Sequence, residues 1–231
     1  MSVLIYTETE QGKFKKNAGE LASYGVALAK NMGVHSVAIA FHPEDAQALS
    51  AYGVDKVLRV SHAELSSFNA KAYASAISQA AKSEAASVVV VSSSADAKYL
   101  SPLVAATLQA SYASNVVALP ESTTPFVVKR TAFSNKGFAH TTLSAAIKMI
   151  GVANNAYGVH ENSGSTTVTD FEPSIEASQF STKTTSVDKV AGKATIADAD
   201  IVVSAGRGLK GPENWGMVED LAKELGAATA C

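Results

Sequence analysis

Cysteine is nearly absent from this sequence, and so are the features that direct a chain into or across a membrane. The 231 residues include one cysteine, Cys231, so the chain cannot form an internal disulfide or a cysteine-based metal cluster. No apolar run approaches the length of a membrane span, and no basic stretch precedes an apolar one after Met1. We therefore expect a cytoplasmic protein of bacterial type, not embedded in a membrane and without a signal or transit peptide.

An excess of charge of either sign is also missing. Charged residues make up 17% of the chain, hydrophobic residues 47%, and the formal net charge is −2. This balance is typical of a folded globular protein, and it gives no general attraction to nucleic acid. A chain of this length forms one large domain, or one domain and part of a second.

The common motifs of metal sites and hydrolases are not found either. The histidines show no H-x-x-x-H or other ligand spacing, so surface or loop positions explain them better than a metal site. They are His35, His42, His62, His140 and His160. The sequence also lacks a G-x-S-x-G motif, a P-loop and paired carboxylates, so we expect no metal and no catalytic residue.

A glycine-rich stretch near the end of the chain is the most informative feature that is present. The apolar run 201–203 leads into Gly206, Gly208 and Gly211, which match G-x-G-x-x-G between a predicted strand and a predicted helix. That helix is predicted over 212–225 from apolar residues at helical spacing, with proline in its first turn and glycine after its end. Glycine lets the backbone approach a ligand closely, and the free N–H groups at a helix start attract anions.

The spacing alone leaves two interpretations open. A dinucleotide site would also place an acidic residue about twenty positions further on, which lies beyond Cys231. A glycine-rich turn that binds no ligand is the alternative.

A longer match resolves this choice. The run Val203-Ser204-Ala205-Gly206-Arg207-Gly208-Leu209-Lys210, followed by Glu213-Asn214, resembles the signature of the electron transfer flavoprotein alpha subunit, which opens the FAD-binding domain of that family. The run departs from the signature only at Ala205, where glycine is usual. The preceding part of the chain, from Met1 onward, resembles the N-terminal domain of the same family.

The resemblance implies an electron carrier rather than an enzyme with its own substrate. Family members hold FAD, pair with a beta subunit, and pass electrons from acyl-CoA and other dehydrogenases, as in fatty acid β-oxidation, to a quinone reductase of the respiratory chain. Arg207 would contact the flavin, while Ser204, Gly206 and Gly208 shape the approach. Because family members continue with a Ser-Arg pair and further FAD-binding loops, we expect 231 residues alone not to retain FAD.

Two alternatives remain for individual residues. Arg207 could be a solvated side chain in a turn, although the flanking glycines and the helix start favour an anionic or flavin partner. Ser92-Ser93-Ser94-Ala95-Asp96 follows a strand and could bind a phosphate, although serine and aspartate are also ordinary helix caps. A nucleotide-binding regulatory module of the α/β type, with its ligand at residues 92–96, is therefore the second functional hypothesis.

The order of predicted elements favours an α/β fold. Strands and helices alternate, and the uninterrupted apolar run 88–91 is typical of a parallel sheet that is covered on both faces. The predicted strands are 3–6, 37–41, 56–60 and 88–91, and the predicted helices are 15–32, 43–49, one capped by Asn69, and one that follows residues 92–94 and carries Leu100 to Leu108. We expect a three-layer parallel-sheet domain of nucleotide-binding type.

The pattern changes after Pro120. Strand-like runs at 126–128 and 138–143 flank turn residues at 134–137, which predicts an added β-hairpin region. Residues 161–188 are rich in serine and threonine, and we expect exposed strands and loops that close the first domain, with a disordered linker as the alternative. Placing the boundary near Gly192 gives an N-terminal α/β domain, 1–192, and the incomplete start of a FAD-binding domain, 193–231, as the first β-α unit of a Rossmann-like fold.

Overall fold

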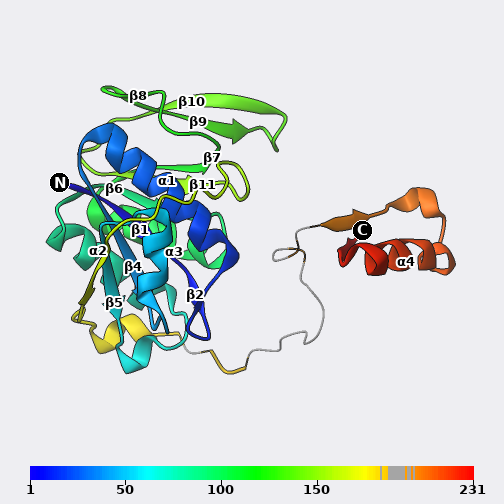
Figure 1. Cartoon of the computed structure of the whole chain (residues 1–231), viewed down its shortest axis with the longest axis horizontal. Helices are drawn as coiled ribbons and strands as arrows, with labels where there is room; N and C mark the ends of the chain where they lie inside the picture. The colour runs from blue at the N-terminus through cyan, green and yellow to red at the C-terminus, as the bar shows by residue number, and fades with distance from the viewer. Residues whose placement is uncertain (183, 187–195, 197–198, 200) are drawn as a thin grey trace. The chain divides into compact units, whose positions relative to one another are not determined.

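A computed structural model provides the structure of the chain, and it describes residues 1–182, 184–186, 196, 199 and 201–231. The chain divides into two compact units, Met1–Lys183 and Thr184–Cys231, and each is described by itself (Figure 1). The boundary predicted near Gly192 lies outside the described residues. The α/β fold class predicted from the sequence is confirmed.

The first unit is built on one large, mostly parallel sheet. Ten strands of the described chain take part, in the order β10-β9-β7-β11-β6-β1-β4-β5-β12, with β8 paired to β9. The parallel strands are β1 (Ser2–Tyr6), β4 (His35–Phe41), β5 (Lys56–Val60), β6 (Ala86–Val91), β7 (Ser111–Val116), β11 (Lys148–Val152) and β12 (Thr167–Asp170). Two of these, β7 and β11, were not predicted from the sequence.

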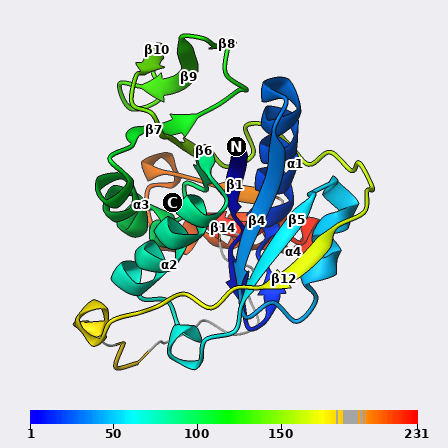
Figure 2. The same ribbon diagram turned by 90° about the vertical axis from the view of Figure 1, so that its left-hand side faces the viewer.

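Helices cover both faces of this sheet and give three layers. The helix α1 (Lys16–Met32) lies on one face, while α2 (Ala70–Ser83) and α3 (Ala95–Leu108) lie on the other (Figure 2). Alternation along β1 divides the core accordingly: Val3 and Ile5 join the cluster under α1, and Leu4 and Tyr6 join the cluster under α2 and α3. Because both faces are covered, β1 is buried along its whole length.

Capping side chains and glycines determine where the helices begin and end and how closely they pack on the sheet. The Asn69 side chain accepts a hydrogen bond from Ala72 N–H at 3.3 Å, so the predicted cap of α2 is confirmed. Gly33 ends α1 in the left-handed conformation, with φ of 64°. Within α1, a Cβ at Gly25 would lie 2.3 Å from Ile5 Cδ1, so this glycine allows the helix to pack closely on β1.

An antiparallel hairpin extends the sheet beyond β7. It consists of β9 (Phe126–Ala132) and β10 (Gly137–Leu143), which pair in an unbroken register from Gly137↔Ala132 to Leu143↔Phe126. The short strand β8 (Ser122–Thr123) pairs with the start of β9. The chain then returns to the parallel region at β11, so the hairpin is an insertion between two parallel strands.

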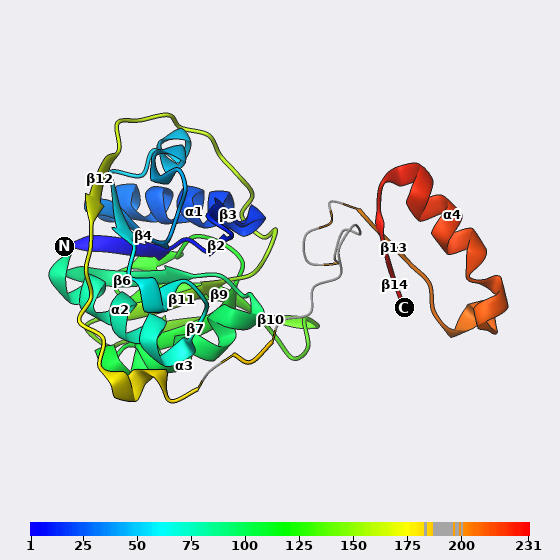
Figure 3. The same cartoon turned by 90° about the horizontal axis from the view of Figure 1, so that it is seen from below.

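A long connection joins β11 in the middle of the sheet to β12 at its far edge, on the side that carries α1 (Figure 3). The Glu20 carboxylate of α1 accepts backbone N–H bonds from Asn155, Tyr157 and Gly158 at 2.8–2.9 Å. Further along, Gly164 N–H donates to Ser50 O at 3.0 Å. Strand β12 then pairs in parallel with β5, so this part of residues 161–188 is a sheet edge rather than a disordered linker.

Short elements complete the first unit. They are the two-stranded pair β2 (Thr9–Glu10) and β3 (Lys13–Phe14), and the 3₁₀ helices η1 (Ala46–Tyr52), η2 (Ala63–Leu65) and η3 (Ala177–Phe180). The helix predicted over 43–49 is thus wrong in its bounds. It begins later because the Asp45 side chain caps it, accepting from Gln47 N–H at 3.0 Å.

The second unit is a small β-α-β arrangement. Its elements are β13 (Val202–Ser204), the 3₁₀ turns η4 (Arg207–Leu209) and η5 (Pro212–Asn214), α4 (Gly216–Leu225) and β14 (Ala228–Ala230). Strands β13 and β14 run parallel. The sequence predicted neither β14 nor the break between η5 and α4. Val218 and Ala222 are buried, whereas Leu221 of the same predicted apolar face is 51% exposed.

Among the residues that the structure describes, no helix is long and apolar enough to cross a membrane.

Candidate functional site

The glycine-rich stretch forms a compact double turn between β13 and α4. Leu209 N–H donates to Gly206 O at 3.1 Å, and Lys210 N–H donates to Arg207 O at 3.1 Å, which closes η4. The Asn214 side-chain amide then donates to Leu209 O at 2.7 Å and ties the second turn to the first. The backbone path is therefore held by its own bonds, while the side chain of Arg207 stays exposed.

Two of the glycines have no steric role in the fold of this turn. A Cβ built on Gly206 or Gly208 would meet no heavy atom of the described residues within 4 Å, and neither residue has a positive φ. Gly206, with φ of −125° and ψ of −161°, is ordinary extended backbone. Both glycines leave open space over the backbone, and a ligand needs such space to approach the backbone closely. Gly211 differs, because a Cβ there would lie 2.3 Å from the Glu213 carboxylate.

A pocket of about 470 Å³ opens beside this turn. Its lining comes entirely from the second unit: Ala205, Gly206, Arg207, Leu209, Lys210, Gly211, Pro212, Trp215 and Cys231. Of the four residues predicted for cofactor binding, Gly206 and Arg207 line the pocket, whereas Ser204 and Gly208 lie next to it in the chain without lining it. The sequence analysis did not assign Lys210 and Trp215 to this site.

The pocket combines a cationic rim with an apolar wall. Arg207 presents a planar group that can donate to a phosphate or a ring carbonyl, and Lys210 adds a second cation. Leu209, Pro212 and Trp215 supply apolar contact of the kind that a flat ring system needs. Lys210 has φ of 68°, a conformation that is unusual for a residue with a side chain and that concentrates at functional sites. These residues fit a flavin dinucleotide.

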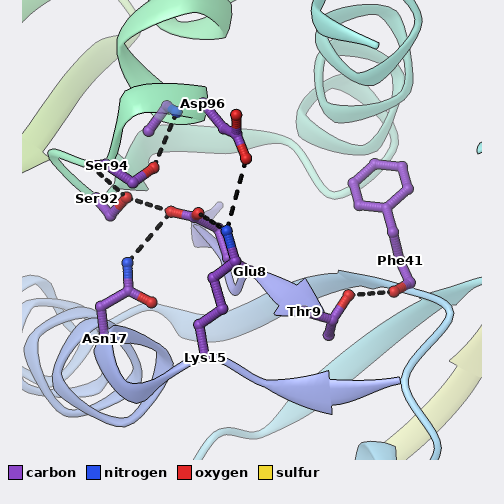
Figure 4. A network of polar contacts seen from close by, with 9 residues as sticks. Glu8, Thr9, Lys15, Asn17, Phe41, Ser92, Ser94 and Asp96 are labelled. Atoms are coloured by element: carbon purple, nitrogen blue, oxygen red, sulfur yellow. Dashed lines mark hydrogen bonds and ion pairs between the residues drawn. The ribbon is translucent and has the colours of Figure 1, made fainter. Parts of the chain in front are cut away.

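A second polar cluster lies at the carboxyl ends of β1 and β6, where the alternative phosphate site was predicted (Figure 4). Its centre is Glu8, which is 1% exposed. The carboxylate accepts a hydrogen bond from the Ser92 hydroxyl and another from the Asn17 amide at 3.3 Å. Lys15 Nζ lies 3.4 Å from Glu8 Oε2 and 3.6 Å from Asp96 Oδ2. A buried carboxylate is thus satisfied by one cation and two neutral donors.

Burial and the neighbouring charges act on the pKa of Lys15 in opposite directions. Burial lowers the pKa of Lys15, and the negative charges of Glu8 and Asp96 more than offset this, so that the pKa lies above its ordinary value. Lys15 therefore stays charged at neutral pH and holds the two carboxylates together.

This arrangement leaves little for a phosphate to bind at residues 92–96. The Ser94 hydroxyl accepts from Ala97 N–H at 3.0 Å and caps α3, which confirms the cap that was favoured from the sequence. Ser92 is bonded to Glu8 on one side and to Ser94 N–H, at 3.0 Å, on the other. The negatively charged Glu8 carboxylate lies where a phosphate would have to bind, and it would repel that phosphate. Sequence reasoning missed Glu8, because its partner Ser92 is 84 residues away.

Two histidine side chains make ordinary polar contacts, whereas His62 Nδ1 is buried and has no hydrogen-bond partner among the residues that the structure describes. His140 Nδ1 lies 2.7 Å from Glu121 Oε2, and His42 Nε2 lies 2.8 Å from His62 O. Within the described ranges, no group of three or more His, Cys, Asp or Glu side chains is arranged to hold a metal ion.

Two known domain families match the chain, one for each unit. Residues 3–176 match the electron transfer flavoprotein domain, and residues 195–231 match the electron transfer flavoprotein FAD-binding domain. The glycine turn and its pocket fall in the second match.

Individual relatives match over nearly the whole chain. The chain is 27% identical to the electron transfer flavoprotein subunit alpha of Thermoanaerobacterium thermosaccharolyticum, over 97% of this chain and 70% of the relative. It is 26% identical to the subunit of the same name in Bacillus subtilis, over 98% of this chain and 70% of the relative. It is 24% identical to protein FixB of Clostridium saccharobutylicum, over 99% of this chain and 70% of the relative. The chain therefore belongs to the electron transfer flavoprotein family and is of its alpha subunit type.

Proposed function

We propose that this protein is the alpha subunit of a heterodimeric electron transfer flavoprotein. It pairs with a beta subunit, holds FAD in the complete assembly, and carries electrons from dehydrogenases such as acyl-CoA dehydrogenases to a quinone reductase. The observation that carries the proposal is the glycine turn, where Gly206 and Gly208 leave the backbone uncovered beside the exposed Arg207. FAD would supply the redox chemistry, and the protein would bind and tune it.

Each residue of the turn has a physical role in this proposal. Gly206 and Gly208 admit the cofactor to the backbone, and Ser204 ends β13 at the approach to the turn. Arg207 and Lys210 place two positive charges where a pyrophosphate or an electron-rich ring would lie. Trp215, on the apolar wall of the pocket, would exclude water from one side of the ring.

The regulatory-module hypothesis is less well supported. In its binding loop, residues 92–96, the Ser92 hydroxyl donates to Glu8, Ser94 N–H donates to Ser92 Oγ, and the Ser94 hydroxyl accepts from Ala97 N–H of α3. A regulatory nucleotide would have to displace the buried Glu8 carboxylate before its phosphate could use these donors. We therefore expect adenosine monophosphate to show no binding to the chain by titration calorimetry.

The proposal is tested by FAD binding with and without the partner. Trp215 lines the pocket and is the sole tryptophan of these 231 residues, and a Trp215→Phe variant separates its emission from that of any other tryptophan in the heterodimer. The 231-residue chain by itself should be purified colourless, because one glycine turn supplies too few contacts to retain a dinucleotide. Full-length alpha subunit co-purified with the beta subunit should contain FAD and show quenched Trp215 emission.

A matched variant separates binding at the turn from binding elsewhere. Gly206→Val places a branched side chain in open space at a residue that lines the pocket, so the fold is kept while the cofactor is obstructed. We expect normal expression and melting of the heterodimer with little FAD. Full FAD content in this variant, or stoichiometric flavin in the 231-residue chain alone, would contradict the proposal.

A further inference from the structure

The outermost strand of the hairpin has an open edge. In the part of the chain that the structure describes, β10 pairs with β9 and with no other strand. Its seven residues run Gly137–Leu143 in a register without a bulge. The N–H and C=O groups that point away from β9 therefore form a ready template for another strand.

The usual protection of such an edge is missing. Edge strands are normally shielded by proline, by lysine, by a bulge or by being very short. Strand β10 contains neither proline nor lysine, and its pairing with β9 is regular. An edge of this kind is expected to be covered by another chain in the working protein.

Large aromatic side chains surround this edge. Phe138 of β10 is 61% exposed, and Phe133, in the turn that joins the two strands, is 84% exposed. Lys129 of β9 places its ammonium group 4.4 Å from the centre of the Phe138 ring. Exposed aromatic residues beside a cation are typical of the central contacts of a protein interface.

The charge of this region indicates the chemistry of its partner. Residues 121–143 contain three cationic residues, Lys129, Arg130 and Lys136, and one acidic residue, Glu121, whereas the whole chain has a net charge of −2. Glu121 is already bonded to His140. The hairpin therefore carries a local excess of positive charge in a chain whose overall charge is nearly balanced, and this favours an acidic partner. A second copy of this chain would instead bring another basic hairpin against the first.

We propose that the free edge of β10, together with Phe133 and Phe138, docks an extended acidic segment of the partner subunit, which adds to the sheet as a further strand. This inference rests on the proposed function, which supplies the partner subunit. Main-chain bonds along β10 would supply affinity, and the two phenylalanines and Lys136 would supply selectivity.

The test measures binding of purified beta subunit to the full-length alpha subunit by calorimetry. Combined Phe133→Ser and Phe138→Ser changes should weaken binding by about tenfold or more, because such exposed rings do little for the fold but much for an interface. Lys136→Glu should weaken binding of the beta subunit less. The difference in affinity between this variant and the wild type should disappear at an ionic strength of about 1 M, where charges are screened within about 3 Å. Hydrogen exchange of residues 137–143 should slow when the beta subunit is added.

A control comes from another exposed aromatic residue. Tyr99 on α3 is 73% exposed, so Tyr99→Ser should leave binding unchanged. If the wild type binds and the double phenylalanine variant binds equally well, the docking surface is wrong while the proposed function stands. If the wild type does not bind the beta subunit at all, both fail. Self-association of the wild type in sedimentation, abolished in the double variant, would assign the edge to a second copy and overturn this inference.

Discussion

In the proposed function, Arg207 is the side chain on which the cofactor chemistry depends most. It lies between two glycines without side chains, on a turn held by its own backbone bonds, and it lines the pocket. A fixed cation beside a flavin favours its reduced, more negatively charged forms, and a partly enclosed site screens that charge less than water does.

Arg207→Ala should therefore lower both the reduction potential of the bound FAD and its retention in the full heterodimer. A contribution of about 1–2 kcal/mol is expected for a charge-assisted contact of this kind. Arg207→Lys should keep only part of this contribution, because the ammonium group of lysine does not reproduce the planar, paired hydrogen-bond donors of a guanidinium group. Redox titration with a flavin-content assay measures both effects. Unchanged potential and content would reduce Arg207 to a structural residue of the turn.

Glu8 is the residue whose loss should matter most to stability. Glu8→Gln keeps the shape of the side chain but removes the charge that Lys15 pairs with in a buried position. Urea unfolding should show a loss of about 2 kcal/mol, as expected when a hydrogen bond to a buried charge is broken. Glu64→Gln, on the exposed surface of η2, is the matched control and should change stability by less than about 0.5 kcal/mol. Equal effects of the two changes would show that the Glu8 cluster is not a stabilising element.

These two residues differ in how far the sequence could predict them. The turn around Arg207 is local: strand, glycines and helix follow one another within 25 residues, so spacing and the family resemblance were enough to find it. The role of Glu8 could not be predicted from the sequence, because its partners Ser92 and Asp96 follow a different strand and only the fold brings them close to it. Lys210 and Trp215 belong to a local motif, but only the pocket shows that they face the same space as Arg207.

Among the elements, strand β12 shows how non-local pairing decides structure. Its sequence, Thr167–Asp170, is polar and short, and only its position beside β5 makes it a strand. The sequence predicted exposed strands here but could not choose their partner. Strands β7, β11 and β14 were also not predicted, and their parallel partners lie elsewhere in the chain, whereas the long helices α1, α2 and α3 followed from their apolar periodicity.

The edge formed by β12 should loosen in acid. Arg59 Nε donates to Asp170 Oδ1 at 2.6 Å, and this hydrogen bond and the arginine charge hold the pKa of Asp170 below its ordinary value. Because the folded pKa is depressed, the stabilisation is complete above the unfolded pKa of about 3.9 and is lost as the pH falls through the folded value. Amide exchange of β12, corrected for intrinsic rates, should therefore rise locally at about pH 3 relative to neutral pH.

Asp170→Asn supplies the control for this pH effect. The variant lacks the titrating group, so its exchange at β12 should already be fast near neutral pH and should change little on acidification. Both side chains are exposed, at 44% and 63%, so the effect should be confined to this edge rather than to global unfolding. If wild type and variant respond alike to acid, the Arg59–Asp170 pair does not hold β12.

At the scale of the whole molecule, the chain consists of two units with separate hydrogen-bonded sheets. All ten strands of the large sheet lie within residues 1–183, while β13 pairs with β14 in the second unit. On α4, Met217, Leu221 and Leu225 recur at intervals of four and are about half exposed or more. Within the second unit, one helix on two short strands does not cover this stripe.

Limited proteolysis should therefore cut between roughly residues 185 and 200 and leave a stable N-terminal fragment, as domain boundaries are preferred cleavage sites. Mass spectrometry gives the cut, and thermal melting of the fragment gives its stability. The fragment should melt cooperatively near the temperature of the intact chain. Cleavage within residues 1–180 at a comparable rate would contradict an independent first unit.

The placement of β12 also has a consequence for synthesis of the chain. Arg59 and Asp170, which join the last two strands of the sheet, are 111 residues apart. At a translation rate of about 5–20 residues per second, the edge of β5 stays open on the ribosome for roughly 5–20 s after it has emerged. During that interval β6, β7, the hairpin and β11 are still being synthesised, so the flank of β5 stays unpaired while the rest of the sheet assembles. Slow decoding before residue 170 would prolong this exposure, so codon choice in that segment should affect the soluble yield of the protein.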